Sequence, residues 1–142
     1  VYGIEISPAA LAVARRNVER HGVADRVRLM VGDILSPRPG PVDLVVANLP
    51  YIPTGQCASL PASVRDHEPW MALDGGPGGL AAIRRLLAQA PAVLHPGGGL
   101  LVEIGADQGD AISRLALTYF PQAEVRVHAD RAGGVRVLEV QT

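Results

Sequence analysis

The chain has 142 residues, about the size of one domain, and its 48% hydrophobic and 19% charged residues exclude an intrinsically disordered polymer. Thirteen basic residues, all arginine, nearly balance fourteen acidic ones, and the formal net charge of −1 argues against a protein that binds nucleic acid mainly through phosphates. The single Cys57 excludes an internal disulfide framework and a multi-cysteine metal cage, and no stretch approaches the ~20 apolar residues of a membrane span. A reducing cytoplasm is the simplest setting, and we expect no metal site.

The first third of the chain is predicted to alternate between strands and a helix. Its elements are a strand, a helix and two further strands, over Val1–Ile6, Ala9–His21, Val27–Val31 and Val42–Ala47. Ser7 is a good N-cap for the helix, and Pro8 suits its first turn because the missing N–H costs nothing there. Gly22 is a natural stop, so the helix is expected to end before the second strand.

An irregular stretch runs from Asn48 to about Gly78 and cannot be one regular element, because five prolines interrupt it. Loops of this length inside a compact domain are usually functional. The elements predicted after it are a helix, a glycine turn, a strand, a second helix and an antiparallel pair of strands: Gly79–Ala90, Gly97–Gly99, Leu100–Ile104, Asp107–Phe120, Glu124–Ala129 and Val135–Val140. This order predicts one α/β domain over residues 1–142, with a mainly parallel sheet and an antiparallel strand at its end.

Residues that directly follow strands are the first candidates for a binding site, because ligands of open α/β sheets bind outside the carboxyl ends of the strands. These positions are Glu5, Asp33, Asn48 and Gly105. A carboxylate at Glu5 fits hydrogen bonds from ribose hydroxyls and, equally, a charge that stabilises the start of the next helix. Asp33 could bond the exocyclic amine of an adenine while Ile34 packs on the ring, although Gly-Asp by itself favours a turn.

The segment Asn48-Leu49-Pro50-Tyr51 is the most specific signal, since it places an amide, an X-Pro bond and an aromatic ring directly after an apolar strand. This set suits methyl transfer to a planar nitrogen, which is a poor nucleophile because its lone pair is delocalised. The Asn48 side-chain oxygen and the Pro50 carbonyl would hold the two N–H bonds and stabilise the developing charge. Tyr51 would stack on the flat group, and Pro50 would keep Leu49 extended.

Other candidate motifs do not support a different chemistry. The run Gly76–Ala81 matches G-x-G-x-x-A, but no convincing strand precedes it, so we interpret it as a turn that opens a helix. The four histidines lie far apart in the sequence, and Cys57 is interpreted as incidental rather than nucleophilic.

Taken in order, these segments resemble the class I S-adenosylmethionine-dependent methyltransferases. The resemblance rests on Val1–Leu11, Gly32–Ile34 and Asn48–Pro53, and a further run, Val64–Leu80, narrows it. With that run, which contains Glu-Pro followed by Ala-Leu-Asp-Gly-Gly, the chain is similar to the protein-(glutamine-N5) methyltransferases of the HemK/PrmC family. These enzymes methylate the glutamine of the Gly-Gly-Gln motif in class 1 peptide-chain release factors.

The resemblance implies a Rossmann-like class I methyltransferase fold and S-adenosyl-L-methionine as the cofactor. It places Glu5 on the cofactor ribose, Asp33 with Ile34 beside the adenine, and Asn48 near the methyl donor. The implied reaction is an in-line transfer from the sulfonium to the amide nitrogen, in which positioning and carbonyl acceptors do most of the work and no strong base is evident.

The resemblance also implies a protein substrate, a class 1 release factor, whose glutamine amide would be held by Asn48, Leu49, Pro50 and Tyr51. Among these, Asn48, Pro50 and Tyr51 are the expected catalytic residues. Glu68, with the proline that follows it, would support the loop around that pocket and so contribute to substrate binding. No membrane partner is expected.

One departure from the family concerns the substrate. The usual tetrapeptide of the family has proline where this chain has Leu49. Asn-Leu-Pro-Tyr also occurs in rRNA adenine-N6 dimethyltransferases, whose acceptor nitrogen poses the same chemical problem. An adenine-N6 methyltransferase acting on rRNA or DNA is therefore the alternative, and the net charge and the Glu-Pro…Gly-Gly block argue against it.

A second departure concerns the start of the chain. In the family, a strand and a glycine-rich loop that binds the methionine part of the cofactor precede the strand at Val1–Ile6. This preceding strand lies centrally in the family's sheet, between the strands that correspond to Val1–Ile6 and Val42–Ala47. Neither this strand and loop nor the family's helical N-terminal domain is present in the sequence. We therefore expect an N-terminally truncated catalytic domain, and the remaining alternative is a non-catalytic remnant that binds a partner.

Overall fold

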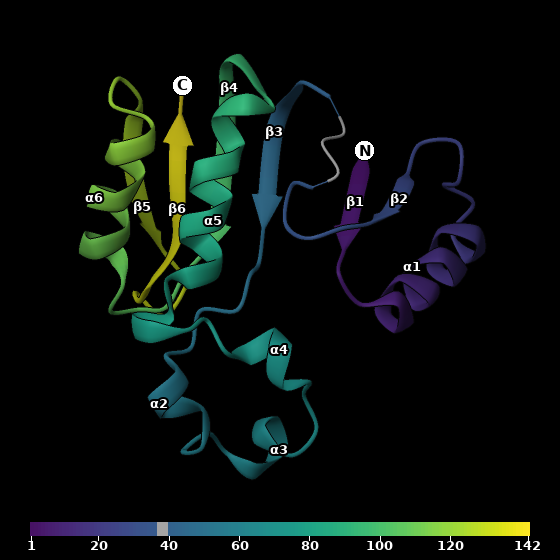
Figure 1. Ribbon diagram of the computed structural model, residues 1–142, viewed down its shortest axis with the longest axis horizontal. Coiled ribbons are helices and arrows are strands. Elements are labelled where there is room, and N and C mark those ends of the chain that lie inside the picture. The colour runs from purple at the N-terminus through teal and green to yellow at the C-terminus, as the bar shows by residue number, and fades with distance from the viewer. Residues whose placement is uncertain (37–39) are drawn as a thin grey trace. The chain divides into compact units, whose positions relative to one another are not determined.

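The computed structural model describes residues 1–36 and 40–142 (Figure 1). It has two compact units, Val1–Gly40 and Pro41–Thr142. The strands of the described residues form two separate sheets, a pair in the first unit and four strands in the second. The organisation of residues 1–142 as one domain stays a prediction.

The first unit is a parallel β–α–β segment with the bounds β1 Tyr2–Glu5, α1 Pro8–Arg20 and β2 Arg28–Val31. The helix begins as predicted, since the Ser7 hydroxyl accepts a hydrogen bond from the Ala10 N–H at 3.3 Å and Pro8 occupies the first turn. Gly22 follows the helix end in the left-handed region, with φ +62°. Leu11 is the buried residue by which α1 packs.

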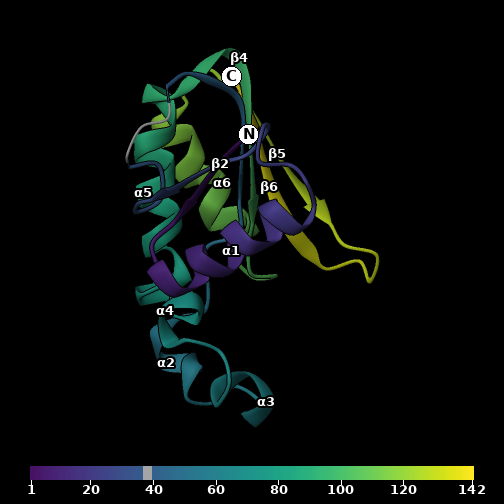
Figure 2. The same ribbon diagram turned by 90° about the vertical axis from the view of Figure 1, so that its right-hand side faces the viewer.

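The second unit is a four-stranded sheet whose one face is covered by two helices (Figures 1 and 2). The strands are β3 Val42–Ala47, β4 Leu94–Glu103, β5 Glu124–Ala129 and β6 Val135–Gln141, and the helices are α5 Ala81–Gln89 and α6 Gly109–Tyr119. The order is β3-β4-β6-β5: β3 pairs with β4 in parallel, and β6 is antiparallel to both β4 and β5. The expected antiparallel strand at the end of the chain is therefore confirmed.

The core of the second unit lies between the sheet and these helices. Buried residues alternate along the strands, as expected of a sheet with one covered face, and recur at three- and four-residue steps along the helices. They include Val45, Leu100, Val102, Leu138 and Val140 on the strands and Ile83, Leu86, Leu87, Ile112 and Ala116 on the helices. Burial of this apolar surface holds β4 and α6 in place, and the junction between these two elements borders the candidate site.

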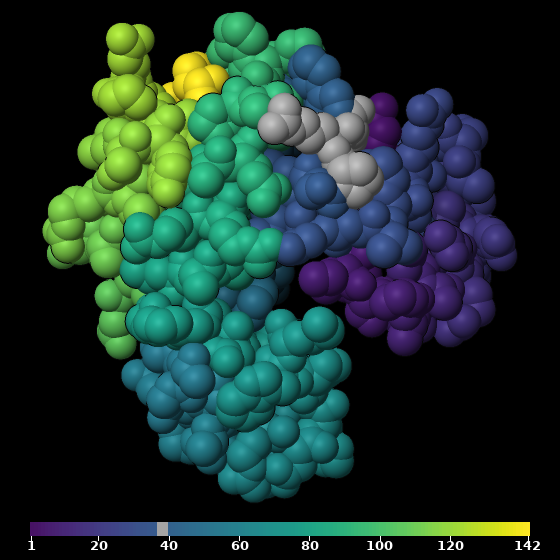
Figure 3. All heavy atoms as spheres, viewed as in Figure 1, coloured from purple at the N-terminus to yellow at the C-terminus, as the bar shows by residue number. Residues whose placement is uncertain are grey.

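The stretch from Asn48 to Gly78 is less irregular than expected. It contains three one-turn helices, α2 Thr54–Cys57, α3 Ala62–Arg65 and α4 Trp70–Leu73, and a short 3₁₀ helix, η1 Pro77–Gly79. Each of the three α-helical turns begins directly after a proline at its N-cap, where the backbone is extended and the missing N–H interrupts no intrahelical hydrogen bond. We call residues 54–73 the excursion; it projects from the second unit beyond the sheet and its helices (Figure 3).

The expected turn at Gly97–Gly99 is wrong, because these glycines lie inside β4. The register explains the sequence signal: Val42 lies opposite Leu94, whereas Leu44 lies opposite Gly99, so β4 has extra residues that bulge from the ladder. Gly97 takes a φ of +79° in this bulge. After α5, a second 3₁₀ helix, η2 Ala90–Ala92, contains Pro91, which cannot continue the α-helix. None of the helices described is long and apolar enough to cross a membrane.

Candidate functional site

The carboxyl ends of β1 and β2 bring the predicted cofactor residues of the first unit to one edge of the two-stranded sheet. Glu5 is the last residue of β1 and lies opposite Val31 in the parallel register, two positions before Asp33. One oxygen of Glu5 accepts the N–H of Ser7, the N-cap of α1, at 2.8 Å. The structure therefore shows that Glu5 supports the start of α1. Its role in binding a ribose stays a prediction, for which the second carboxylate oxygen could accept the hydrogen bonds.

The turn after β2 is built around Ile34. Asp33 and Ser36 exchange backbone hydrogen bonds of 2.7 and 3.0 Å, which closes a tight turn. Ile34 sits within it at φ +58°, in a region where a β-branched side chain is rare and strained. Two carboxylates at one edge can accept hydrogen bonds from the hydroxyls and amine of an adenosine, and a partly exposed apolar side chain can pack on its ring. These groups therefore suit the expected cofactor.

In the second unit, the predicted acceptor segment Asn48–Tyr51 leaves the carboxyl end of β3. Asn48 is exposed, and its side chain makes no hydrogen bond with any other described residue. Leu49, Pro50 and Tyr51 are half-buried. The structure thus presents one free amide on a loop whose next three residues are packed against the protein, which is the arrangement that a planar acceptor needs.

Tyr51 is held at both of its ends by the junction between β4 and α6. Its hydroxyl donates a hydrogen bond to Glu103 Oε1 at 3.1 Å, and its carbonyl accepts one from Gln108 Nε2 at 2.8 Å. Burial, followed by the hydrogen bond and charge of Glu103, raises the pKa of the Tyr51 phenol above its ordinary value of 10.0. The phenol therefore stays protonated at neutral pH and serves as a fixed donor and aromatic surface.

A glycine-rich turn packs directly on the backbone of this segment. The Ile52 N–H donates to the Leu73 carbonyl at 3.1 Å, and the Gly75 N–H donates to the Ile52 carbonyl at 2.8 Å. A Cβ added at Gly75 would lie 2.6 Å from the Pro50 carbonyl oxygen, and one added at Gly79 would lie 2.0 Å from the Tyr51 carbonyl oxygen. The glycines are needed here for close approach, and the run is, as interpreted, a turn that leads into a helix.

Asp74 joins the two ends of the excursion. Its Oδ1 accepts the Thr54 hydroxyl at 2.7 Å and the Gly76 N–H at 2.9 Å, and its Oδ2 accepts the Trp70 indole N–H at 3.2 Å. These donors favour the ionised carboxylate, and the Thr54 hydroxyl has the largest effect in lowering the pKa of Asp74 below its usual value. One ionised carboxylate thus closes the excursion beside the acceptor segment.

The lowered pKa of Asp74 predicts an acid-sensitive excursion. A carboxyl whose folded pKa is depressed contributes stability above its unfolded pKa, 3.8, and loses it as the pH falls through the folded value. We expect the emission of Trp70 to change as the pH falls below 3.8, after subtraction of the signal of Trp70→Phe. Asp74→Asn should abolish this transition.

Asp130 provides the matched control for that titration. Its carboxylate accepts the N–H groups of Gly134 and Ala132 in the turn between β5 and β6, and these bonds, with Gly134 first, lower its pKa as well. Asp130→Asn should leave the Trp70 transition unchanged. A transition that persists in both variants would mean that global acid unfolding, and not Asp74, produces it.

Two further residues of the excursion were singled out from the sequence. Glu68 is exposed, and its side chain makes no hydrogen bond with the described residues, so its support of the loop stays a prediction, while Asp74 visibly performs such a role. Cys57 is buried, donates to the Pro53 carbonyl at 3.6 Å, and burial raises the pKa of its thiol. A buried thiol of this kind is unreactive, which agrees with its interpretation as incidental.

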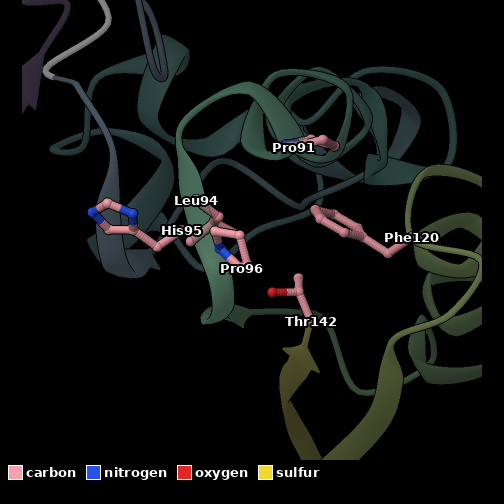
Figure 4. A pocket seen from close by; sticks show the side chains of 6 residues that line it. All are labelled: Pro91, Leu94, His95, Pro96, Phe120 and Thr142. Atoms are coloured by element: carbon pink, nitrogen blue, oxygen red, sulfur yellow. The ribbon is translucent and has the colours of Figure 1, made fainter.

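A hollow of about 230 Å³ lies elsewhere on the second unit (Figure 4). It is lined by Pro91, Leu94, His95, Pro96, Phe120 and Thr142. Leu94 begins β4, and β4 runs parallel to β3, so the hollow is at the end of the sheet opposite Asn48. It is not part of the candidate site, and no group of three or more His, Cys, Asp or Glu side chains that could hold a metal occurs in the part of the chain that the structure describes.

The sequence analysis missed Glu103, Asp74 and Gln108. Glu103 and Gln108 flank Gly105, which the rule about strand ends had selected, so a search of the neighbouring polar residues would have found both. Asp74 lies in the Ala-Leu-Asp-Gly-Gly block that supported the resemblance, but its partners are 20, 4 and 2 positions away in sequence. Such a cluster has no spacing signal that a single sequence reveals.

Residues 1–126 match the family described as methyltransferase domain. The chain is 51% identical over 134 residues to the release factor glutamine methyltransferase of Moorella thermoacetica, and the alignment covers 94% of this chain and 47% of that protein. The chain spans about half the length of the curated relatives it matches.

Solved structures confirm the expected fold class. A methyltransferase from Pyrococcus furiosus matches with a TM-score of 0.71 at 20% identity, over 99% of this chain and 61% of that chain. A protein from Streptococcus mutans solved in complex with SAH matches with a TM-score of 0.57 at 17% identity, over 99% of this chain and 74% of that chain. At these identities the likeness concerns the fold, a Rossmann-like α/β sheet that is mainly parallel.

Proposed function

The chain belongs to the methyltransferase domain family, and we propose that it acts as an S-adenosylmethionine-dependent methyltransferase of the side-chain amide of a protein glutamine. The observation that carries this proposal is the acceptor segment: the free Asn48 side chain stands at the carboxyl end of β3, on a loop that Gln108, Glu103 and the glycine turn hold in place. The curated relatives, of whose length this chain spans about half, are named release factor glutamine methyltransferases, and their names support the same reaction.

The residues of the segment divide the work by their chemistry. The Asn48 side-chain oxygen and the Pro50 carbonyl accept the two N–H bonds of the substrate amide and stabilise the charge that develops on its nitrogen. Gly75 leaves room at the Pro50 carbonyl, because any Cβ there would lie 2.6 Å from its oxygen. Tyr51 offers its ring as a stacking surface, and Leu49 contributes an apolar wall.

S-adenosylmethionine, the cofactor of this family, supplies an electrophilic methyl group on a sulfonium. In this chain Glu5 would hold the ribose, and Asp33 with Ile34 would hold the adenine. Asn48 would also border the methyl donor. The protein's contribution is therefore orientation and charge stabilisation, and no side chain is required to act as a strong base.

We also propose that residues 1–142 belong to one catalytic domain, and that in the complete protein a further strand pairs with the open edge of β3. Among the described residues, β1 pairs only with β2, and β3 pairs only with β4. Leu44 and Val46 on β3 are 53% and 70% exposed, and an apolar edge strand of this kind is normally paired or covered. A further strand would pair with this edge of β3.

As the substrate we propose the Gly-Gly-Gln glutamine of a class 1 peptide-chain release factor, and as the compartment the cytoplasm, where such a substrate works in translation. The formal net charge of −1 lacks the overall basic excess that usually accompanies binding to nucleic-acid phosphates. The adenine-N6 alternative has only Leu49 in its favour.

The direct test is an incubation of the full-length protein with radiolabelled S-adenosylmethionine, a release factor and rRNA. We expect label in the release factor, and none when its Gly-Gly-Gln glutamine is replaced by alanine. Label confined to rRNA would overturn the proposal in favour of adenine-N6 methylation. An absence of label in both, together with no cofactor binding by calorimetry, would identify a non-catalytic remnant.

A further inference from the structure

We propose that Gln108 is the positioning residue of the acceptor segment: one buried amide that locks Asn48–Tyr51, the glycine turn and the end of β4 into the geometry required for transfer. The inference rests on the proposed function and deepens it, because it names a residue outside the acceptor segment on which the chemical step depends.

The geometry of Gln108 supports this role. It is the one buried polar residue among those described, with 8% exposure. Its Oε1 accepts the Gly105 N–H at 2.8 Å, and its Nε2 donates to the Tyr51 carbonyl at 2.8 Å and to the Gly78 carbonyl at 3.0 Å. All the polar atoms of the side chain are thus used, and they join the connection that contains Gly105 to two segments that lie 57 and 30 residues before Gln108 in sequence.

The direction of this side chain is not explained by the helix on which it lies. Gln108 occupies the N-cap position of α6, yet it makes no side-chain capping hydrogen bond there. Instead the side chain reaches back to the acceptor segment. The side chain therefore serves the loop and not the helix start.

Only a primary amide of this length can make the three bonds. Two carbonyl oxygens, of Tyr51 and Gly78, need a donor with two N–H bonds, and the Gly105 N–H needs an acceptor on the same group. A glutamate has the same shape, but its ionised oxygen would face two carbonyl oxygens. A methionine of similar length would leave both carbonyls and the N–H without partners.

The connection to chemistry runs through Tyr51. Its carbonyl, fixed by Gln108, belongs to the peptide next to the Pro50 carbonyl, the proposed acceptor for the substrate amide. The Tyr51 hydroxyl is fixed by Glu103, five residues before Gln108 on the same connection. Glu103 and Gln108 therefore fix the position of both the ring and the backbone of Tyr51, the last residue of the acceptor segment. A shift of about 1 Å in such a segment is enough to lower the rate about 10²-fold.

The test is the isosteric substitution Gln108→Glu in the full-length enzyme. At neutral pH and above we expect kcat to fall about 10²-fold, while the Kd for S-adenosylmethionine changes less than about threefold. As the pH falls, the ratio of variant to wild-type kcat should rise, because burial raises the pKa of the new carboxyl and its protonated form can donate to one carbonyl again. A merely structural defect would not produce this rescue.

Gln141 is the matched control. Its Nε2 also donates to two backbone carbonyls, of Gly97 at 2.8 Å and Gly98 at 3.3 Å, but at the bulge of β4 far along the strand from the loop. Gln141→Glu should leave kcat and its pH profile unchanged. An equal kcat loss in both variants, or a wild-type kcat in Gln108→Glu at every pH, would overturn the proposal.

Hydrogen exchange separates this inference from the proposed function, because it needs no activity. Gln108→Glu should speed exchange at the Ile52 and Gly75 amides, which bond across the two segments, and Gln141→Glu should not. If the wild-type enzyme methylates no glutamine but exchange behaves as expected, the proposed function fails while the locking role stands. If Gln108→Glu does not fold, Gln108→Met replaces it, and unchanged exchange and kcat in that variant would overturn the role.

Discussion

Replacement of Asn48 by alanine is expected to lower kcat for glutamine methylation by about 10²–10³-fold, while the affinity for S-adenosylmethionine is largely spared. The reason is that the Asn48 side chain is exposed and makes no hydrogen bond with the described residues, so its removal costs the fold little. What is lost is one of two carbonyl acceptors for the substrate N–H bonds. Single-turnover kinetics with the release factor, combined with calorimetry of the cofactor, measures the two effects separately.

Asn17 is the matched control, since it is the other asparagine of the chain and lies exposed on α1. Asn17→Ala should retain the wild-type kcat and, because alanine is a better helix former, the wild-type stability or slightly more. An equal loss of transfer and of cofactor affinity in Asn48→Ala would mean that Asn48 serves the cofactor or the fold and not the acceptor.

The substitution Gly79→Ala is expected to have the largest effect on stability. Gly79 is buried at φ +72°, and an added Cβ would lie 2.0 Å from the Tyr51 carbonyl oxygen and 2.4 Å from Gln108 Nε2. The left-handed backbone and the overpacking together should cost at least about 3 kcal/mol in the free energy of unfolding. Because the displaced atoms belong to the acceptor segment, activity should fall with stability even at temperatures where the variant is folded.

Its neighbour Gly78 isolates the steric part of that effect. Gly78 has a similar φ of +66°, but a Cβ there would meet no atom within 4 Å. Gly78→Ala should therefore cost only about 1–2 kcal/mol, the penalty of the left-handed backbone, and keep its activity. Chemical denaturation and kcat of the two variants test this; equal losses would mean that backbone strain alone, and not contact with the acceptor segment, requires these glycines.

Most of the secondary structure, and the position of the candidate acceptor segment after β3, could be predicted because they depend on local chemistry. Ser7, Pro8 and Gly22 define α1 by capping and backbone preference. The apolar period of the segments predicted the order of strands and helices, and the rule of strand ends selected Asn48. The excursion and the bulge at Gly97 were not predicted, because short proline-initiated turns and a register shift depend on what the neighbouring strand offers.

By itself, then, the sequence determined the α/β class, the order of the main strands and helices, and the position of the tetrapeptide Asn48–Tyr51 directly after a strand, since each of these follows from residues within a few positions of one another. Only the tertiary structure decided how that tetrapeptide is held. The tetrapeptide is held by Gln108, Glu103 and the glycine turn, which contact Tyr51 from 57, 52 and about 28 positions later in the sequence. A single sequence carries no signal for such pairs, because a buried amide acquires its partners only when packing of β4 and α6 brings the segments together.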